Sequence, residues 1–192
     1  MSDPRIVLAS SSPRRRELLQ SAGLAFSTEA CDAVEIHDPA LGLAGLVTAN
    51  ARTKALTVAA AHPDAIVIGA DTLVWLEGRA LGKPADPDHA RRMLKQLAGR
   101  VHEVATGVHL VHLDSRRQIE FHEVTRVRFR ALDGAAIDDS LARVHVLDKA
   151  GAYALQEQGE LLVESVEGSR SNVVGLPLER TLAALQRFAG EA

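Results

Sequence analysis

Residues 65–70 read AIVIGA, a continuous apolar run that Asp71 and Thr72 follow directly. Such a run is typical of a strand covered on both faces, as in the parallel sheets of α/β proteins. Ligands of these sheets usually bind outside the carboxyl ends of the strands. We therefore expect Asp71 and Thr72 to lie at the C-terminal end of this strand, next to a ligand.

The segments on either side of this run alternate between strand and helix patterns. Further strands are expected at residues 5–9, 25–30 and 161–166, with hairpins at residues 73–81 and 101–129. A change of apolar phase between Phe121 and Val127 indicates a bulge in the second hairpin. Helices are expected from Pro13 onward, at residues 41–61, 86–97 and 133–142, and after Pro177. Residues 149–159 read as an irregular loop, and the whole pattern predicts an α/β fold with a mixed sheet.

Length and composition limit the class of protein. Of the 192 residues, 46% are apolar, enough for a full core without disulfides or a structural metal, in one domain or two closely joined lobes. The formal charge of −3 is spread along the chain, so we expect neither a nucleic-acid partner nor a membrane surface. Cys31 is the only cysteine, which suits a reducing cytoplasm. The first apolar run is shorter than a signal peptide or a membrane span requires, so neither export nor insertion is expected.

The helix expected at residues 41–61 has two polar residues on its apolar side. Leu46, Val47 and Val58 recur at three- and four-residue steps, and Asn50 and Lys54 fall on the same face. Polar groups on a buried face need hydrogen-bond partners. Asn50 and Lys54 are therefore expected to meet such partners inside the protein.

A cluster of hydroxyl and guanidinium groups follows the first strand. Residues 10–16 read SSSPRRR, with Ser12 as the expected helix cap and Pro13 in the first helical position. The free N–H groups at a helix start favour anions, whereas cations there are normally disfavoured. A solvated basic patch with serine capping is the alternative for a single arginine. Three arginines together favour a bound phosphate, whose oxygens a planar guanidinium can hold in two places.

The sequence also contains acidic and basic candidates for a site that binds phosphate and a metal. Asp71 is expected at the edge of the core, where its carboxylate must be hydrogen-bonded, paired or bound to a metal; a capping aspartate is the alternative. Glu35 lies in a polar segment and is a candidate second ligand for Mg²⁺, with a plain surface glutamate as the alternative. Lys54 and Lys83 are candidates to hold an anion near Asp71, and for each an exposed side chain is the alternative.

Other chemistries lack their sequence patterns. His109 and His112 should point to opposite faces of a strand, which does not suit shared zinc ligation. The chain has no G-x-x-x-x-G-K-[ST] loop, no G-x-G-x-x-G turn and no G-x-S-x-G motif. The sequence therefore does not support a P-loop, a Rossmann or a simple serine-hydrolase interpretation.

Five blocks of the sequence resemble the Maf family of nucleotide pyrophosphatases. They are LASSSPRR at residues 8–15, GADT at 69–72 with GKP at 82–84, HEVAT at 102–106, DKAGAYALQ at 148–156 and EGSRSNVVGLPL at 167–178. The blocks cover nearly the whole chain in the expected order. The resemblance implies one domain over residues 1–192 with two lobes and a cleft between them. It also implies an elongated, twisted mixed sheet flanked by helices, like that of the inosine triphosphate pyrophosphatases.

The resemblance further implies the reaction, in which a nucleoside triphosphate is split into its monophosphate and pyrophosphate with Mg²⁺ or Mn²⁺. By motif, Asp71 looks like the proton acceptor and a metal contact, Glu35 like a second metal contact, and Arg14, Arg15, Lys54 and Lys83 like phosphate holders beside Ser10. Arg14, Thr72 and Gln156 match the branch that acts on dTTP and UTP.

Three alternatives remain open at this point. They are a 7-methyl-GTP enzyme, an enzyme of broad specificity, and a nucleotide-binding regulator of cell division. A homodimer is common in the family and is a further expectation for this chain.

Overall fold

The computed structural model describes residues 5–190. The strands are β1 (Ile6–Ala9), β2 (Ser27–Glu29), β3 (Ile66–Leu76), β4 (Arg79–Leu81), β5 (Val101–His112), β6 (Arg117–Phe129) and β7 (Val163–Glu167). The helices are α1 (Pro13–Ser21), η1 (Pro39–Leu41), α2 (Gly42–Ala59), α3 (Pro87–Leu97), α4 (Gly134–Arg143), η2 (Ala150–Ala152), α5 (Leu155–Leu162), α6 (Arg170–Val174) and α7 (Leu178–Gly190). Among the described residues, no helix is long and apolar enough to cross a membrane.

The chain divides into two compact units. Unit 1 comprises the described residues up to Thr72, residues 106–123 and residues 175–190; unit 2 comprises residues 73–105 and 124–174. Strands β3, β5 and β6 have residues in both units. The cleft expected between two lobes stays a prediction.

The strands form one sheet in the order β2-β1-β3-β5-β6-β7, with β4 paired to β3. Strand β1 pairs in parallel with β2 and β3, whereas β4 pairs antiparallel with β3, and β7 pairs antiparallel with β6. This arrangement confirms the predicted mixed sheet. In the pairing of β1 with β3, Ala9 lies opposite Gly69, so β1 ends there while β3 continues to Leu76.

The predicted position of Asp71 and Thr72 at the end of their strand is therefore wrong. Both residues lie inside β3. Asp71 and Thr72 follow Gly69, the last β3 residue that pairs with β1. They therefore lie beside the carboxyl end of β1, the neighbouring parallel strand, where ligands of such sheets usually bind. The apolar run identifies the strand correctly. The polar residues after the run do not end the strand, because β3 continues into its hairpin with β4.

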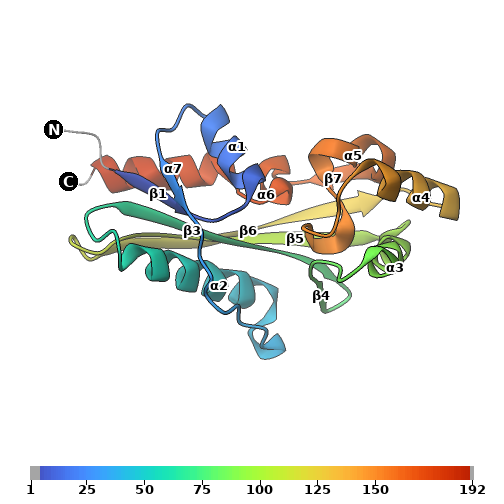
Figure 1. The fold of residues 1–192 in the computed structure, drawn as a ribbon, viewed down its shortest axis with the longest axis horizontal. Coiled ribbons are helices and arrows are strands. Elements are labelled where there is room, and N and C mark those ends of the chain that lie inside the picture. The colour runs from blue at the N-terminus through green and yellow to red at the C-terminus, as the bar shows by residue number, and fades with distance from the viewer. Residues whose placement is uncertain (1–4, 191–192) are drawn as a thin grey trace. The chain divides into compact units, whose positions relative to one another are not determined.

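In unit 1 the sheet is covered on both faces (Figure 1). Helices α1 and α7 pack on one face, where Leu19 and Phe188 meet Ile66 and Ile68. Helix α2 packs on the other face. There Ala55 and Val58 contact strand residues such as Val67, whose side chains point away from the face of Ile66 and Ile68. Because side chains alternate along a strand, Asp71 shares the α2 face with Val67. Thr72 points to the face of α1 and α7.

Two glycines bring α2 close to the sheet. A Cβ on Gly69 would lie 2.2 Å from the carbonyl oxygen of Ala51, and a Cβ on Gly107 would lie 2.3 Å from that of Val47. Real Cβ atoms do not approach oxygen this closely, so any larger residue would push the helix backbone away. The short separation lets polar side chains of α2 reach Asp71.

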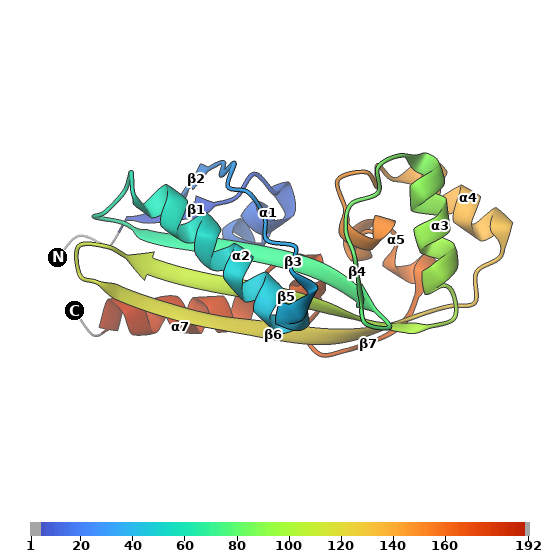
Figure 2. The ribbon, with the colours of Figure 1, turned by 90° about the horizontal axis from the view of Figure 1, so that it is seen from below.

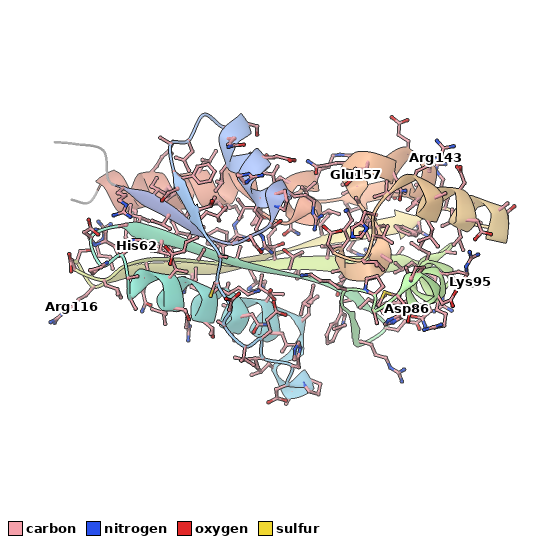
Figure 3. The ribbon with its side chains drawn as sticks, in the orientation of Figure 1. His62, Asp86, Lys95, Arg116, Arg143 and Glu157 are labelled. Atoms are coloured by element: carbon pink, nitrogen blue, oxygen red, sulfur yellow. The ribbon has the colours of Figure 1, made fainter. Side chains whose placement is uncertain are left out.

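Unit 2 has a core of its own. Helices α3, α4 and α5 contribute Leu94, Ile137 and Leu162 to one cluster, which includes Phe129 and Tyr153, and Figure 2 shows the three helices grouped together. The side chain of Asp86, labelled in Figure 3, caps α3 by accepting a hydrogen bond from the His89 N–H at 2.6 Å. This cap confirms the predicted helix start.

Two other expectations are wrong. Residues 149–159 were expected to form a loop, but Leu155, Gln158 and Leu162 form the buried side of helix α5. Burial of this side outweighs the low helix propensity of Gly159. Along β6, burial alternates in one phase from Arg117 to Phe129, so the expected change of phase between Phe121 and Val127 does not occur. The pairing of β6 with β7 has a register shift between Arg128 and Phe129, and the predicted bulge in the hairpin of β5 and β6 stays a prediction. Val124, an apolar residue between these two positions, is 41% exposed.

Candidate active site

Asp71 is a buried carboxylate with two hydrogen-bond donors from α2. Asp71 as a whole residue is 5% exposed. The ammonium of Lys54 donates to Oδ1 at 2.6 Å, and the amide of Asn50 donates to Oδ2 at 3.3 Å. The two donors stand one helical turn apart, as the apolar stripe of this helix predicts. The carboxylate is therefore both paired and oriented.

Lys54 joins Asp71 to a second acid. Its Nζ also donates to Oε1 of Glu35 at 2.7 Å. Lys54 and Asp71 side chains are 13% and 7% exposed, whereas that of Glu35 is 44% exposed. The structure thus brings together three of the residues predicted from sequence, with two carboxylates that converge on one cation. Glu35 reaches the site from a segment, residues 30–38, that has no helix or strand of its own.

A second polar group occupies the opposite face of β3. Arg15, in the first turn of α1, donates from Nε to the Gly175 carbonyl at 2.8 Å, from Nη1 to Ser10 Oγ at 3.2 Å and from Nη2 to Thr72 Oγ1 at 3.0 Å. The hydroxyl of Thr72 also lies 2.9 Å from that of Thr106. Arg15 therefore ties the loop after β1 to β3 and to the chain before α7.

The two groups influence each other electrostatically. Burial lowers the pKa of the Arg15 guanidinium from its ordinary value, and the negative charge of Asp71 opposes this shift. Arg14 lowers the pKa further, while Glu35 raises it. A guanidinium keeps its charge despite such shifts. The carboxylates and this cation therefore share one electrostatic environment although they contact different faces of the strand.

The start of α1 carries an unusual charge. Arg14, Arg15 and Arg16 follow Pro13 directly, and the first turn contains no acidic residue. Arg14 and Arg15 are half-buried and Arg16 is exposed. The predicted cap Ser12 makes no side-chain capping bond; its own N–H donates to Ser10 Oγ at 3.2 Å.

Two predicted site residues belong to unit 2. Lys83 is exposed and lies two residues after the end of β4, before the buried Pro84. Gln156 is exposed near the start of α5, beside Glu157, which Figure 3 labels. Their participation in the site stays a prediction.

Three contributors had no assigned role in the sequence interpretation. They are the amide of Asn50, the hydroxyl of Thr106 and the carbonyl of Gly175. A signal existed for each: Asn50 falls on the inward face of its helix, and Thr106 and Gly175 lie in the blocks HEVAT and EGSRSNVVGLPL. Their partners could not be known before the strands were placed side by side.

Comparison with known proteins identifies relatives over nearly the whole chain. The family model described as Maf-like protein matches residues 5–188. A dTTP/UTP pyrophosphatase of Moorella thermoacetica is 49% identical over 184 residues, covering 96% of this chain and 95% of the relative. One of Akkermansia muciniphila is 44% identical over 182 residues, covering 95% of each chain.

A solved structure, that of the Staphylococcus aureus Ham1 protein, has a similar fold. It covers 98% of this chain and 100% of its own, with a TM-score of 0.55 and 16% sequence identity. At this identity the match shows the fold alone.

Proposed function

Because the chain belongs to the Maf-like family, we propose that it hydrolyses dTTP and UTP to the monophosphate and pyrophosphate. These are the substrates in the names of relatives that align along almost all of its length. The residues Arg14, Thr72 and Gln156, which match this branch in sequence, support the same choice of base. Removal of unwanted triphosphates from the cytoplasmic nucleotide pool is the proposed role, and a homodimer is the expected assembly.

The observation that carries the proposal is the contact of two carboxylates with one cation. Glu35 Oε1 and Asp71 Oδ1 both accept from Lys54 Nζ, at 2.7 and 2.6 Å. A structural ion pair needs only one acid for one lysine. The second acid places a pair of carboxylates beside one lysine, which is more than a structural ion pair of that lysine requires.

The same pair of acids fits a divalent metal. Mg²⁺ and Mn²⁺ prefer oxygen ligands, and Mg²⁺ is usually held by one or two carboxylates together with substrate phosphates and water. Because both contact the ammonium of Lys54, carboxylate oxygens of Glu35 and Asp71 lie close enough together to share a further cation beside Lys54. We propose that these two residues hold the metal. When bound, it would stabilise negative charge on the phosphate oxygens.

Asp71 is the proposed proton acceptor. A water molecule adds its oxygen to the α-phosphorus, the bond from this phosphorus to the oxygen bridging to the β-phosphate breaks, and pyrophosphate leaves. Asp71 takes the proton that the water loses. Each carboxylate oxygen has two lone pairs, so Oδ1 and Oδ2 can accept from water while Lys54 and Asn50 hold them in place.

The cations at the start of α1 are the proposed phosphate holders. Three arginines in a helical first turn oppose the helix dipole, and a bound polyphosphate would relieve this repulsion. Arg15 uses three of its five N–H groups on Gly175, Ser10 and Thr72, which leaves two for phosphate oxygens. We propose Arg14 and Lys83 for the same role, and Thr72 and Gln156 for contacts to the base.

A panel of triphosphates tests the function. The purified chain is incubated with dTTP, UTP, 7-methyl-GTP and the common purine triphosphates, with Mg²⁺, with Mn²⁺ and with chelator, and pyrophosphate is measured. Metal-dependent release from dTTP and UTP, at a kcat/KM at least tenfold above the other nucleotides, is expected. Preference for 7-methyl-GTP would reject the proposed base, and tight nucleotide binding without turnover would favour the regulator.

A further inference from the structure

Asn50 is a buried amide whose hydrogen bonds extend beyond the one that it donates to Asp71. It is 2% exposed and lies on α2, one turn before Lys54. An amide on the apolar side of a helix is costly unless its donors and acceptors are satisfied. Its partners therefore indicate why the residue is there.

The first partner is the backbone of Ile36. Oδ1 of Asn50 accepts from the Ile36 N–H at 2.7 Å, and Nδ2 donates to the Ile36 carbonyl at 3.2 Å. This double pairing assigns the two ends of the amide, because the reverse orientation would place oxygen against oxygen. Ile36 follows Glu35 directly, so the amide holds the backbone at the residue next to the proposed metal contact.

The second partner is the carboxylate of Asp71. Nδ2 donates to Oδ2 at 3.3 Å, while Lys54 donates to Oδ1. Asn50 therefore contacts the same two parts of the chain as Lys54, namely the segment of Glu35 and the side chain of Asp71. Lys54 joins them through side-chain charge, whereas Asn50 joins a backbone to a carboxylate.

We propose that Asn50 is a positioning residue that keeps the carboxylates of Glu35 and Asp71 at the separation and orientation needed for turnover. The proposal rests on the function proposed above. Residues 30–38 have no ladder of helix or strand bonds, so the two bonds to Ile36 restrain the part of the segment next to Glu35. The bond to Oδ2 limits rotation of the Asp71 carboxylate about its Cβ–Cγ axis.

Two substitutions separate these effects. Asn50→Leu has a similar shape and makes none of the three bonds. Asn50→Asp keeps an acceptor for the Ile36 N–H but loses the donors and puts a second carboxylate against Asp71. Thr53→Val is the matched control, since the Thr53 hydroxyl donates within α2, to the Ala49 carbonyl at 3.0 Å.

The first measurement is hydrogen exchange in the protein without nucleotide or metal. We expect the Ile36 amide to be protected in the wild type and in Thr53→Val, and to exchange at least tenfold faster in Asn50→Leu. Asn50→Asp should retain most of the protection. Peptides from the centre of β3 serve as the reference, because their exchange reports global opening.

The second measurement is steady-state turnover of the preferred triphosphate. Misplacing reacting groups by about 1 Å costs as much as 10²-fold in rate, so kcat should fall about 10- to 100-fold in Asn50→Leu and Asn50→Asp. KM should change less than about threefold, because the phosphate holders remain. A loss of stability alone would lower the active fraction and leave the kcat of folded molecules unchanged.

The outcomes distinguish the two proposals. If the wild type turns over and Asn50→Leu has the same kcat, the role of Asn50 is overturned. The role is also overturned if the Ile36 amide of the wild type exchanges as fast as an amide in an unstructured peptide. If Asn50→Leu fails to fold, Asn50→Asp and the wild-type exchange decide. Absence of wild-type turnover on every triphosphate would instead overturn the proposed function, and the Ile36 exchange would still test the contact of Asn50 with this segment.

Discussion

Replacing Lys54 with methionine removes the ammonium that Glu35 and Asp71 share and leaves a side chain of similar length. The two acids lose the same partner but differ in what they can do next. Glu35 has a side chain that is 44% exposed and can turn into water at little cost. Asp71 has a side chain that is 7% exposed and cannot. The loss of stability is therefore expected to arise almost entirely at Asp71.

The structure sets the size of this loss. Removing one partner of a buried ion pair costs about 3–5 kcal/mol, and the remaining bond from Asn50 to Oδ2 places Lys54→Met at the lower end, about 3 kcal/mol. For a chain of this length, that corresponds to a decrease in Tm of roughly 6–12 °C. In Lys54→Met/Asp71→Asn no buried charge is left unpaired, so the double variant should recover to within about 1 kcal/mol of the wild type.

Urea unfolding followed by circular dichroism measures the wild type, both single variants and the double variant as a cycle. The expected coupling between Lys54 and Asp71 is about 2 kcal/mol or more. Lys95→Met is the control, because Lys95 is an exposed residue of α3, as Figure 3 shows, and its replacement should change stability by less than about 0.5 kcal/mol. A loss below about 1 kcal/mol in Lys54→Met, or no recovery in the double variant, would refute the reasoning.

Three further predictions concern the reaction, the packing of α2 and the response to acid. Asp71→Asn should lower kcat by about 10²–10⁴-fold while calorimetry still detects nucleotide binding, and near-normal turnover would exclude Asp71 as the proton acceptor. Gly69→Ala should destabilise the protein by at least about 1–3 kcal/mol and lower turnover as well, since its Cβ would lie 2.2 Å from the Ala51 carbonyl oxygen. Gly134→Ala is the control, because the space around its Cβ is open, and equal stability of the two variants would contradict the close packing of α2. Burial lowers the pKa of His102 from 6.5 to about 4, so between these values the unfolded chain binds a proton that the folded protein does not. The unfolding free energy should therefore fall by as much as about 3 kcal/mol from this residue as the pH decreases from 6.5 to 4, and His102→Gln should show a correspondingly flatter pH dependence; parallel curves would disprove it.

Much of the fold followed from local patterns. The apolar run at residues 65–70 identified the central strand, and the pairs Ser12-Pro13 and Asp86-Pro87 marked two helix starts at the correct residues. These signals act over a few residues, through caps and through the period of side chains, and so they can be read without knowing the partners. The same period placed Asn50 and Lys54 on the inward face of α2, although it could not name what they meet there.

What remained undetermined depended on contacts between distant segments. The end of β3 is set by its pairing with β4, and the identity of α5 as a helix is set by the core that buries Leu155 and Leu162. The end of β3 and the helix α5 both differ from the prediction, because Asp71 resembles a residue that ends a strand and Gly159 one that breaks a helix. Such local preferences are weaker than the effect of burial.

The candidate site shows the same division. Residue types and motifs predicted that Asp71, Glu35, Lys54 and the arginines near Ser10 belong to a phosphate-binding site. Only the tertiary structure decided that Asp71 and Thr72 face opposite sides of β3, that Asn50 joins Asp71 across 21 residues, and that Arg15 reaches the Gly175 carbonyl across 160 residues. The physical reason is that hydrogen bonds and close packing have a reach of a few ångströms, so residues far apart in the chain acquire them only once the sheet has brought them together.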